Sequence, residues 1–137
     1  MKKQDSINTN LTKRDLDVMN VLWNSDEPKT AAMVVKARPD LTMNTVQAVL
    51  RKLLNNSLIE VADIVYSGTV LSRCYKPAIS QSDFTLCKMT SEYQSLKQKL
   101  SKVSILAALL DTEDDPETVK QDIAQIREFL DNYKKGE

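Results

Sequence analysis

The spacing of apolar residues changes once in the first half of the chain, close to Leu58. Before this point apolar residues recur every three or four positions, which is the spacing of amphipathic helices. After it, residues 59–66 combine alternation with β-branched side chains, and residues 70–76 repeat this character beyond a Ser67-Gly68-Thr69 turn signal. A lone hairpin is not stable in water, so the predicted hairpin must pack on the preceding helices.

Two short helices are predicted first. Thr12 is the expected N-cap of one, with Asp15 in the position of a capping box. The other begins after Thr30 and stops before Pro39, because a proline disfavours a helical residue ahead of it. The apolar face of the first helix consists of Leu16, Met19, Leu22 and Trp23.

The third predicted helix, from about Met43 to Asn56 with Thr42 as N-cap, has the clearest amphipathic pattern. Its apolar stripe consists of Val46, Val49, Leu50, Leu53 and Leu54. About four residues separate it from the second helix, as in a helix-turn-helix. The sequence therefore predicts a mainly α winged helix-turn-helix, three helices plus a β-hairpin wing, over residues 11–79, after a flexible N-terminus at residues 1–10.

The side of the third helix opposite its apolar stripe carries the residue types that read DNA. Asn and Gln can pair with adenine, Arg with guanine, and Thr and Ala can contact the thymine methyl group. The alternative, an ordinary solvated helix face, is disfavoured by its place as the second helix of a helix-turn-helix beside a hairpin. Hydroxyl groups near the hairpin turn can contact phosphate, whereas Tyr66 and Tyr75 are expected to pack on the helices. The predicted DNA-binding residues are Thr42, Asn44, Thr45, Gln47, Ala48, Arg51, Lys52, Ser67, Thr69 and Arg73.

Residues 80–137 are predicted to form a helical dimerisation region. Apolar residues between Leu86 and Leu110 follow the alternating steps of three and four that are typical of heptads. Whether one helix or two span residues 81–112 is left open, with residues 99–102 as the expected break, and Pro116 suits the first turn of a last helix. The alternative for these apolar rows is packing within one chain. The predicted dimerisation residues are Leu86, Met89, Tyr93, Leu96, Leu100, Val103, Leu110, Ile123, Ile126 and Leu130.

The composition excludes several classes of protein. There is no histidine, so Ser-His-Asp and Cys-His catalysis and His-ligated metal sites are excluded. Cys74 and Cys87 lack the spacing of zinc ligands and are interpreted as reduced, half-buried thiols, with a single disulfide as the alternative. No secretory signal is found, and the longest apolar run, at residues 105–110, is far shorter than the ~20 residues of a membrane span. We expect a soluble, cytoplasmic protein without catalytic residues, metal or cofactor.

The net charge is zero but unevenly distributed. Residues 1–80 carry a net charge of +3 and residues 81–137 carry −3. This asymmetry is typical of a chain with one half facing nucleic acid and the other facing a partner. The predicted partners are double-stranded operator DNA and a second copy of the chain, with no membrane. The small positive charge predicts weak, strongly salt-dependent non-specific binding.

Three segments resemble the penicillinase-repressor family. Residues 11–23, LTKRDLDVMNVLW, resemble its first helix, which combines an acidic residue, Val-Met and an apolar pair ending in Trp. Residues 42–53, TMNTVQAVLRKL, resemble its recognition helix, and Tyr75-Lys76-Pro77 followed by Ser82-Asp83-Phe84 resembles its exit from the wing. The resemblance is good over residues 11–84 and holds in outline beyond them.

This resemblance implies a winged-helix repressor that dimerises through C-terminal helices and binds a palindromic operator. Members of the family control β-lactam-resistance or copper-homeostasis genes. Carried over by position, the resemblance implies that the operator is faced by Thr42, Asn44, Thr45, Gln47, Ala48 and Arg51.

The sequence departs from the family in four places, of which one is a hairpin a few residues longer than in the resistance repressors. No cysteine follows Cys87, which rules out the Cys-x-Cys copper site of copper-sensing members. Residues 92–96 lack the Asn-Phe bond at which β-lactam-responsive members are cleaved, which argues against induction by that protease; a regulatory protease or an unknown inducer is kept as a partner. Asn55-Asn56-Ser57 stands where many members have Lys-Lys-Gly, which weakens the expected phosphate contacts. Two alternatives to a repressor are a winged-helix regulator that senses a small molecule and a winged-helix adaptor that binds only protein.

Overall fold

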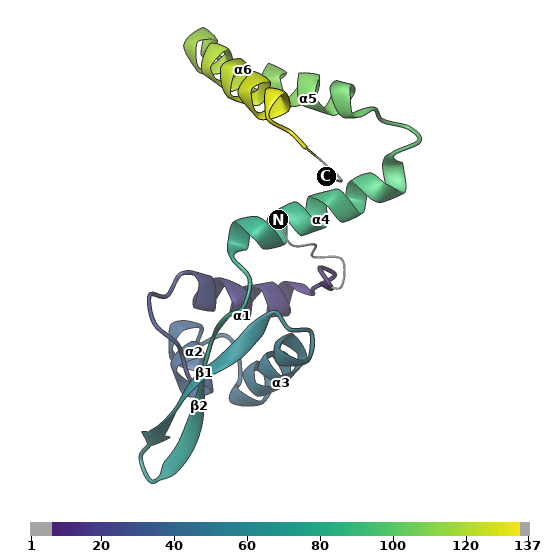
Figure 1. The fold of residues 1–137 in the computed structure, drawn as a ribbon. Coiled ribbons are helices and arrows are strands. Elements are labelled where there is room, and N and C mark those ends of the chain that lie inside the picture. Colours follow the sequence, from purple (N-terminus) through teal and green to yellow (C-terminus); the bar gives the residue numbers. More distant parts are fainter. Residues whose placement is uncertain (1–6, 135–137) are drawn as a thin grey trace. The chain divides into compact units, whose positions relative to one another are not determined.

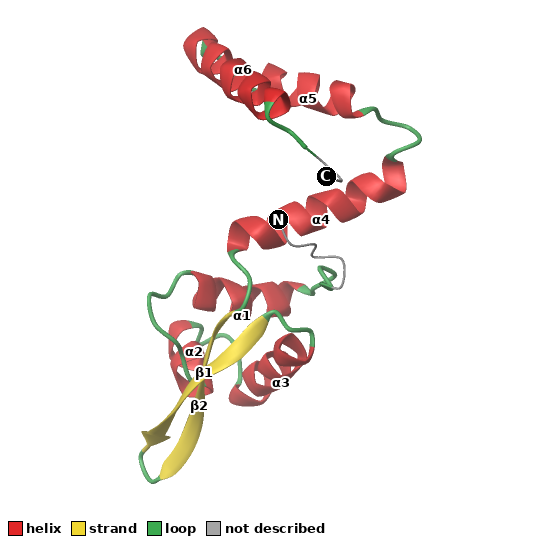
Figure 2. Ribbon diagram, in the orientation of Figure 1, coloured by secondary structure: helices red, strands yellow, loops and turns green. Residues whose placement is uncertain are grey.

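The computed structural model describes residues 7–134 and contains, within them, six helices and one antiparallel hairpin (Figures 1 and 2). The elements are α1 (Lys13–Trp23), α2 (Ala31–Ala37), α3 (Met43–Asn55), β1 (Ile59–Ser67), β2 (Val70–Pro77), α4 (Gln81–Leu96), α5 (Lys102–Asp111) and α6 (Pro116–Asp131). Three helices followed by a hairpin confirm the predicted mainly α winged helix-turn-helix. Among residues 7–134, no helix is long and apolar enough to cross a membrane.

The chain divides into two compact units, the first ending at Glu92 and the second beginning at Tyr93. The first unit therefore includes the winged helix and most of α4. This division falls later than the domain boundary that we predict after residue 79. The reason is that Ile79 and Phe84 belong to the buried core of the winged helix and Cys87 packs against it.

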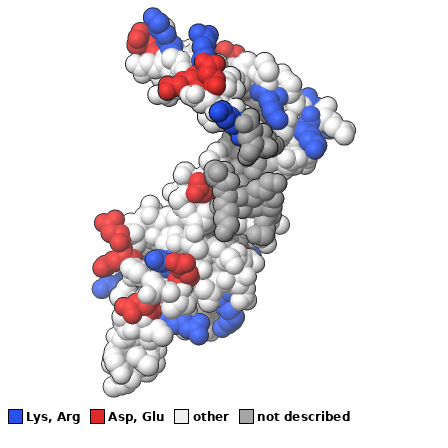
Figure 3. Space-filling model, viewed as in Figure 1, with Lys and Arg blue, Asp and Glu red and all other residues white. Residues whose placement is uncertain are grey.

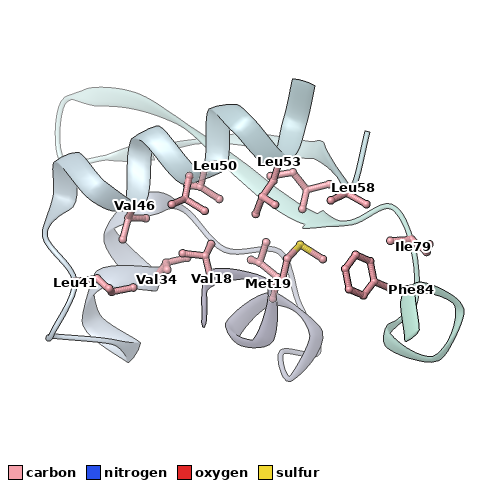
Figure 4. Close-up of a cluster of buried hydrophobic side chains, with 13 residues drawn as sticks. Val18, Met19, Val34, Leu41, Val46, Leu50, Leu53, Leu58, Ile79 and Phe84 are labelled. Atoms are coloured by element: carbon pink, nitrogen blue, oxygen red, sulfur yellow. The ribbon is translucent and has the colours of Figure 1, made fainter. Parts of the chain in front are cut away.

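The core of the first unit lies between the three helices and is closed by the base of the hairpin and the start of α4. Figure 4 shows Val46, Leu50 and Leu53 of α3 facing Val18 and Met19 of α1. Burial of each such side chain stabilises the fold by about 1.5–3 kcal/mol. The buried cluster consists of Val18, Met19, Leu22, Val34, Leu41, Val46, Val49, Leu50, Leu53, Leu58, Ile59, Ile79 and Phe84.

Side-chain caps begin the first three helices where the sequence predicts. The Thr12 hydroxyl accepts a hydrogen bond from the Asp15 N–H at 3.2 Å, and the Asp15 carboxylate accepts one from the Thr12 N–H at 3.0 Å. This pair confirms the predicted capping box. Thr30 and Thr42 cap α2 and α3 in a similar way, each accepting from the N–H three residues further on.

The last turn of α3 is closed by a residue in the left-handed conformation, Ser57, with φ of 62°. Its N–H donates to the Leu54 carbonyl at 3.1 Å, and the Leu58 N–H donates to the Leu53 carbonyl at 3.0 Å. These two bonds form a Schellman motif, in which glycine is the usual left-handed residue. A side chain in this conformation costs about 1–2 kcal/mol, so Ser57 is a strained end to α3.

We expect Ser57→Gly to raise the free energy of unfolding by about 0.5–1 kcal/mol, because glycine relieves the steric strain but is more flexible in the unfolded chain. Urea denaturation followed by circular dichroism measures this change. Ser57→Ala is the matched control, since alanine keeps the Cβ that causes the strain and should leave stability nearly unchanged. An equal gain from both variants would show that the strain does not lie in the backbone.

The hairpin is anchored at its base and exposed towards its turn. Besides pairing with β1, Tyr75 exchanges backbone hydrogen bonds with Lys29, at 2.9 and 2.8 Å, which ties β2 to the segment before α2. Tyr75 packs against the core as predicted. The same prediction for Tyr66 is wrong: it is 74% exposed, because the strands extend beyond the helices (Figure 1). Gly68, with φ of 70°, supplies the turn.

The second unit holds α5 and α6, and none of the described residues of these helices is buried. Residues 97–101 separate α4 from α5, which confirms the predicted break in this region. Pro116 occupies the first turn of α6, as predicted. In the first unit, Cys74 is buried, Cys87 is half-buried, and both thiols are free.

Candidate nucleic-acid interface

The surface of α3 opposite its buried stripe is exposed and polar. Val46, Val49, Leu50 and Leu53 face the core, so the helical period places the predicted reading residues on the outer side. No acidic residue occurs in α3. The exposed members of the predicted set on this helix are Asn44, Gln47, Ala48, Arg51 and Lys52.

An ion-pair network braces the turn that connects α2 with α3. The Arg38 guanidinium donates to both carboxylate oxygens of Asp40, at 2.9 and 2.8 Å, and pairs with Asp17 of α1 at 3.2 Å. The Arg38 guanidinium holds the pKa of the Asp40 carboxyl below its ordinary value. The network ties the turn to α1, so that α3 is presented in a fixed orientation.

Lys52 is committed to an intramolecular pair. Its ammonium group contacts the carboxylate of Asp15, which is 3% exposed. Burial alone would raise the pKa of Asp15, but the hydrogen bonds from Lys52 and Thr12 outweigh it and the pKa is lowered. Lys52 thus joins α3 to the start of α1, and its predicted contact with DNA would compete with this pair.

The two threonines at the start of α3 also bind each other. The Thr42 hydroxyl donates to the Thr45 hydroxyl at 2.9 Å while it accepts the Thr45 N–H at 3.1 Å. Their hydroxyls therefore serve the cap first. The remaining N–H groups of the first turn have no intrahelical partner and can bind a DNA phosphate.

A groove of about 570 Å³ lies between α3 and β2. Gln47 and Arg51 line it from α3, and Arg73 lines it from β2. Arginine binds phosphate in a bidentate manner, so Arg73 on the wing side of the groove suits the DNA backbone, whereas Arg51 on the helix side is the predicted base-reading residue. The structure thus brings together two predicted residues that lie far apart in the sequence.

Sequence reasoning missed Leu71 and Ser72, which line the same groove. Leu71 lies two positions from Arg73 on β2, so strand alternation places both on one face, whereas no signal in the sequence indicated Ser72. A serine hydroxyl at this position is a further hydrogen-bond donor to phosphate.

The end of the wing is apolar rather than basic. Tyr66, Val70 and Leu71 are exposed, and Figure 3 shows no charged residue over the tip of the wing in this view. Thr69 is exposed at the turn, whereas the side chain of Ser67 lies outside what the structure describes. The cation that the wing offers to the groove is Arg73.

The predicted dimerisation residues are mostly exposed in the single chain. On α4, Leu86 and Met89 are exposed within the first unit. In the second unit Tyr93, Leu110 and Ile126 are half-buried, and the exposed members are Leu96, Leu100, Val103, Ile123 and Leu130.

The structure adds two exposed residues that the heptad pattern missed, Leu109 and Phe129, and Tyr133, which continues the heptad row of Ile126 and Leu130, is exposed as well. The rings of Phe129 and Tyr133 are in contact, with centroids 5.4 Å apart and an interplanar angle of 45°. The signal for Phe129 was its place next to Leu130 near the end of α6, since two adjacent large apolar side chains exceed one heptad stripe.

A winged helix-turn-helix that presents Asn, Gln and Arg on an exposed recognition helix defines a class of DNA-binding proteins. The sequence model of the penicillinase repressor family matches residues 11–132. The chain belongs to this family, and so it is a DNA-binding repressor by family and fold. Among residues 7–134, no group of three or more side chains is gathered in a way that could hold a metal ion.

The solved structures that match part of the chain share little sequence with it. The homodimeric winged helix-turn-helix DNA-binding domain of a Mycobacterium bovis protein is 17% identical, with a TM-score of 0.43, over 67% of this chain and 80% of that one. The reduced form of the transcriptional regulator YodB from B. subtilis is 16% identical, with a TM-score of 0.42, over 66% and 83%. The Hop2-Mnd1 complex of Giardia lamblia is 16% identical, with a TM-score of 0.39, over 87% and 76%. No curated protein matches the chain significantly.

Proposed function

We propose that the protein is a dimeric repressor that binds a palindromic operator by placing α3 in the major groove. The observation that carries this proposal is the exposed face of α3, where Asn44, Gln47 and Arg51 can form hydrogen bonds with base edges. Arg73 lines the groove beside this face from the wing and can hold the DNA backbone as it passes between helix and wing. Base contacts would give the sequence preference, and phosphate contacts would fix the orientation.

The dimer is supported by the apolar surface of the C-terminal helices. None of the described residues of α5 and α6 is buried, although α5 is rich in leucine and α6 carries a heptad stripe. A second copy of the chain would cover these side chains, and a two-fold dimer has the symmetry of a palindrome. The two recognition helices would then reach half-sites about 34–36 Å apart, or a multiple of this distance.

The regulated genes would be of the kind that this family controls, β-lactam resistance or copper homeostasis, and the protein would act in the cytoplasm. Release from the operator needs a signal, either a regulatory protease or an inducer molecule. Residues 88–137 contain no cysteine, so they do not supply the Cys-x-Cys site of copper-sensing members.

Selection from a library of random DNA duplexes by the full chain tests the proposal. We expect enrichment of a palindrome with two equal half-sites. In gel shifts with the selected duplex, the logarithm of the binding constant should fall linearly with the logarithm of the salt concentration. A duplex of the same composition in scrambled order is the control. Neither enrichment nor salt-dependent binding would occur if the winged helix served only as a protein adaptor.

A further inference from the structure

We infer that Trp23, together with Phe84 and the Ile79 carbonyl, forms a rigid junction that sets the spacing between operator half-sites the dimer accepts. The inference rests on the proposed function and adds a residue that determines specificity without touching DNA. Trp23 is a positioning residue in this role.

The junction is held by one hydrogen bond and one ring contact. The Trp23 Nε1–H donates to the Ile79 carbonyl at 2.9 Å, although the two residues are 56 positions apart. The rings of Trp23 and Phe84 lie with centroids 5.5 Å apart at an interplanar angle of 53°. Ile79 is 7% and Phe84 is 4% exposed. The last turn of α1 therefore binds the segment that leads from β2 into α4.

Further hydrogen bonds fix the segment between β2 and α4 residue by residue. The Ala78 N–H donates to the Leu58 carbonyl at 2.9 Å, next to the end of α3. The Ser80 hydroxyl accepts the Asp83 N–H at 3.1 Å, and the Ser80 carbonyl accepts the Phe84 N–H at 2.9 Å. No glycine occurs between Gly68 and Gly136. The first turns of α4 thus leave the winged helix in a fixed direction and belong to the same compact unit.

A fixed exit of α4 constrains how two winged helices can be placed on DNA. Leu86 and Met89 of α4 are exposed within this rigid unit and carry predicted dimer contacts. In B-DNA, each added base pair between half-sites moves the second half-site by about 3.4 Å and turns it by roughly 35°. A rigid junction cannot follow this rotation, so one spacing is preferred. A loosened junction would let each recognition helix adjust, and several spacings would then bind with similar affinity.

A merely structural role for Trp23 predicts a different result. If the ring only fills the core, its replacement weakens the winged helix itself, and affinity for a single half-site falls together with affinity for the full operator. If the ring sets spacing, single half-site affinity is kept and only the preference among spacings is lost. The two roles are separated by measuring both quantities.

The test uses the full chain, wild type and Trp23→Phe, because phenylalanine keeps an aromatic ring but has no N–H to donate. The probes are the palindromic duplex selected from random DNA, the same duplex with one base pair removed or with one or two added at its centre, and a duplex with one half-site. We expect the wild type to lose about tenfold in affinity for each altered spacing, on the scale of one mismatched base pair. Trp23→Phe should lose about twofold or less, with half-site affinity unchanged.

A second variant keeps the test valid if Trp23→Phe folds poorly. Two glycines inserted after Lys88 interrupt α4 beyond Phe84 and Cys87, its residues that contact the core, and so free the rest of the helix while leaving Trp23, Ile79 and Phe84 in place. Trp23 is the single tryptophan, so an unchanged emission spectrum confirms an intact junction. The matched control inserts two glycines after Gly68 in the exposed turn of the wing and should keep the wild-type spacing preference.

Three outcomes would overturn the inference. An unchanged spacing profile in both junction variants would show that the exit of α4 does not set the spacing. If both junction variants lost affinity for the single half-site and for the full operator to the same extent, Trp23 would have only a structural role in the core. If the wild type selected a single half-site and no palindrome, the proposed dimeric function would be wrong, and this inference with it. The selection with the wild type alone shows this outcome, so it is distinguishable from a failure of the inference.

Discussion

Leu130→Asp should convert the protein to a monomer and lower its affinity for the selected operator by about 10²–10⁴-fold. Leu130 is 61% exposed in the single chain, so an aspartate there costs the fold of the monomer little. In the proposed dimer the same side chain is buried against the second copy, where an unpaired carboxylate is strongly unfavourable. The loss of operator affinity equals the loss of avidity when two half-sites are no longer bound together.

Sedimentation velocity at micromolar concentration and gel shifts on the operator measure the two effects of Leu130→Asp. Gln121→Asp is the matched control, because it adds the same charge to α6 outside the apolar stripe and should keep both dimer and affinity. If the Leu130→Asp protein still sedimented as a dimer, the apolar stripe of α6 would not be part of the dimer interface.

Arg51→Ala should cost about 1–3 kcal/mol of operator binding, which is roughly a 5- to 150-fold loss, and should relax the preference at one base pair of each half-site. Arg51 is exposed on the outer face of α3, and its guanidinium can make a bidentate pair with guanine O6 and N7. Its loss leaves the stability of the fold nearly unchanged, because the side chain is not part of the core.

Competition gel shifts with operators that differ at single base pairs measure this effect. Arg127→Ala, which removes an exposed arginine from α6 in the second unit, is the control for charge alone and should keep the base preference. Equal affinity of wild type and Arg51→Ala for every operator variant would exclude Arg51 from base reading. A uniform loss across all operators would assign Arg51 to phosphate instead.

Local signals in the sequence were sufficient to predict the first three helices and the residues at which they begin. Thr12, Thr30 and Thr42 each stand before an apolar period, and a cap needs only partners within three residues. The hairpin followed from alternation on both sides of Gly68. The outer face of α3 followed from its buried stripe, because one face of a helix fixes the other.

Features that depend on distant residues could not be predicted. Lys52 looks like a free cation on the reading helix, and only the folded chain brings it to Asp15 of α1. The alternation of β1 indicates a strand but not how far the strand extends past the helices, so Tyr66 was wrongly expected to be covered. The contact of Trp23 in α1 with the Ile79 carbonyl is of the same kind, because it joins two residues 56 positions apart.

The exposed apolar side chains of α5 and α6 have a consequence for the stability and degradation of the protein in a cell. In the proposed dimer, these helices gain their apolar contacts only when a second chain arrives, so their stability depends on protein concentration. At low expression the C-terminal helices would be exposed to proteases, whereas the winged helix has its own core. The amount of repressor and its rate of degradation would then be coupled, and the regulator would be cleared fastest when it is scarce.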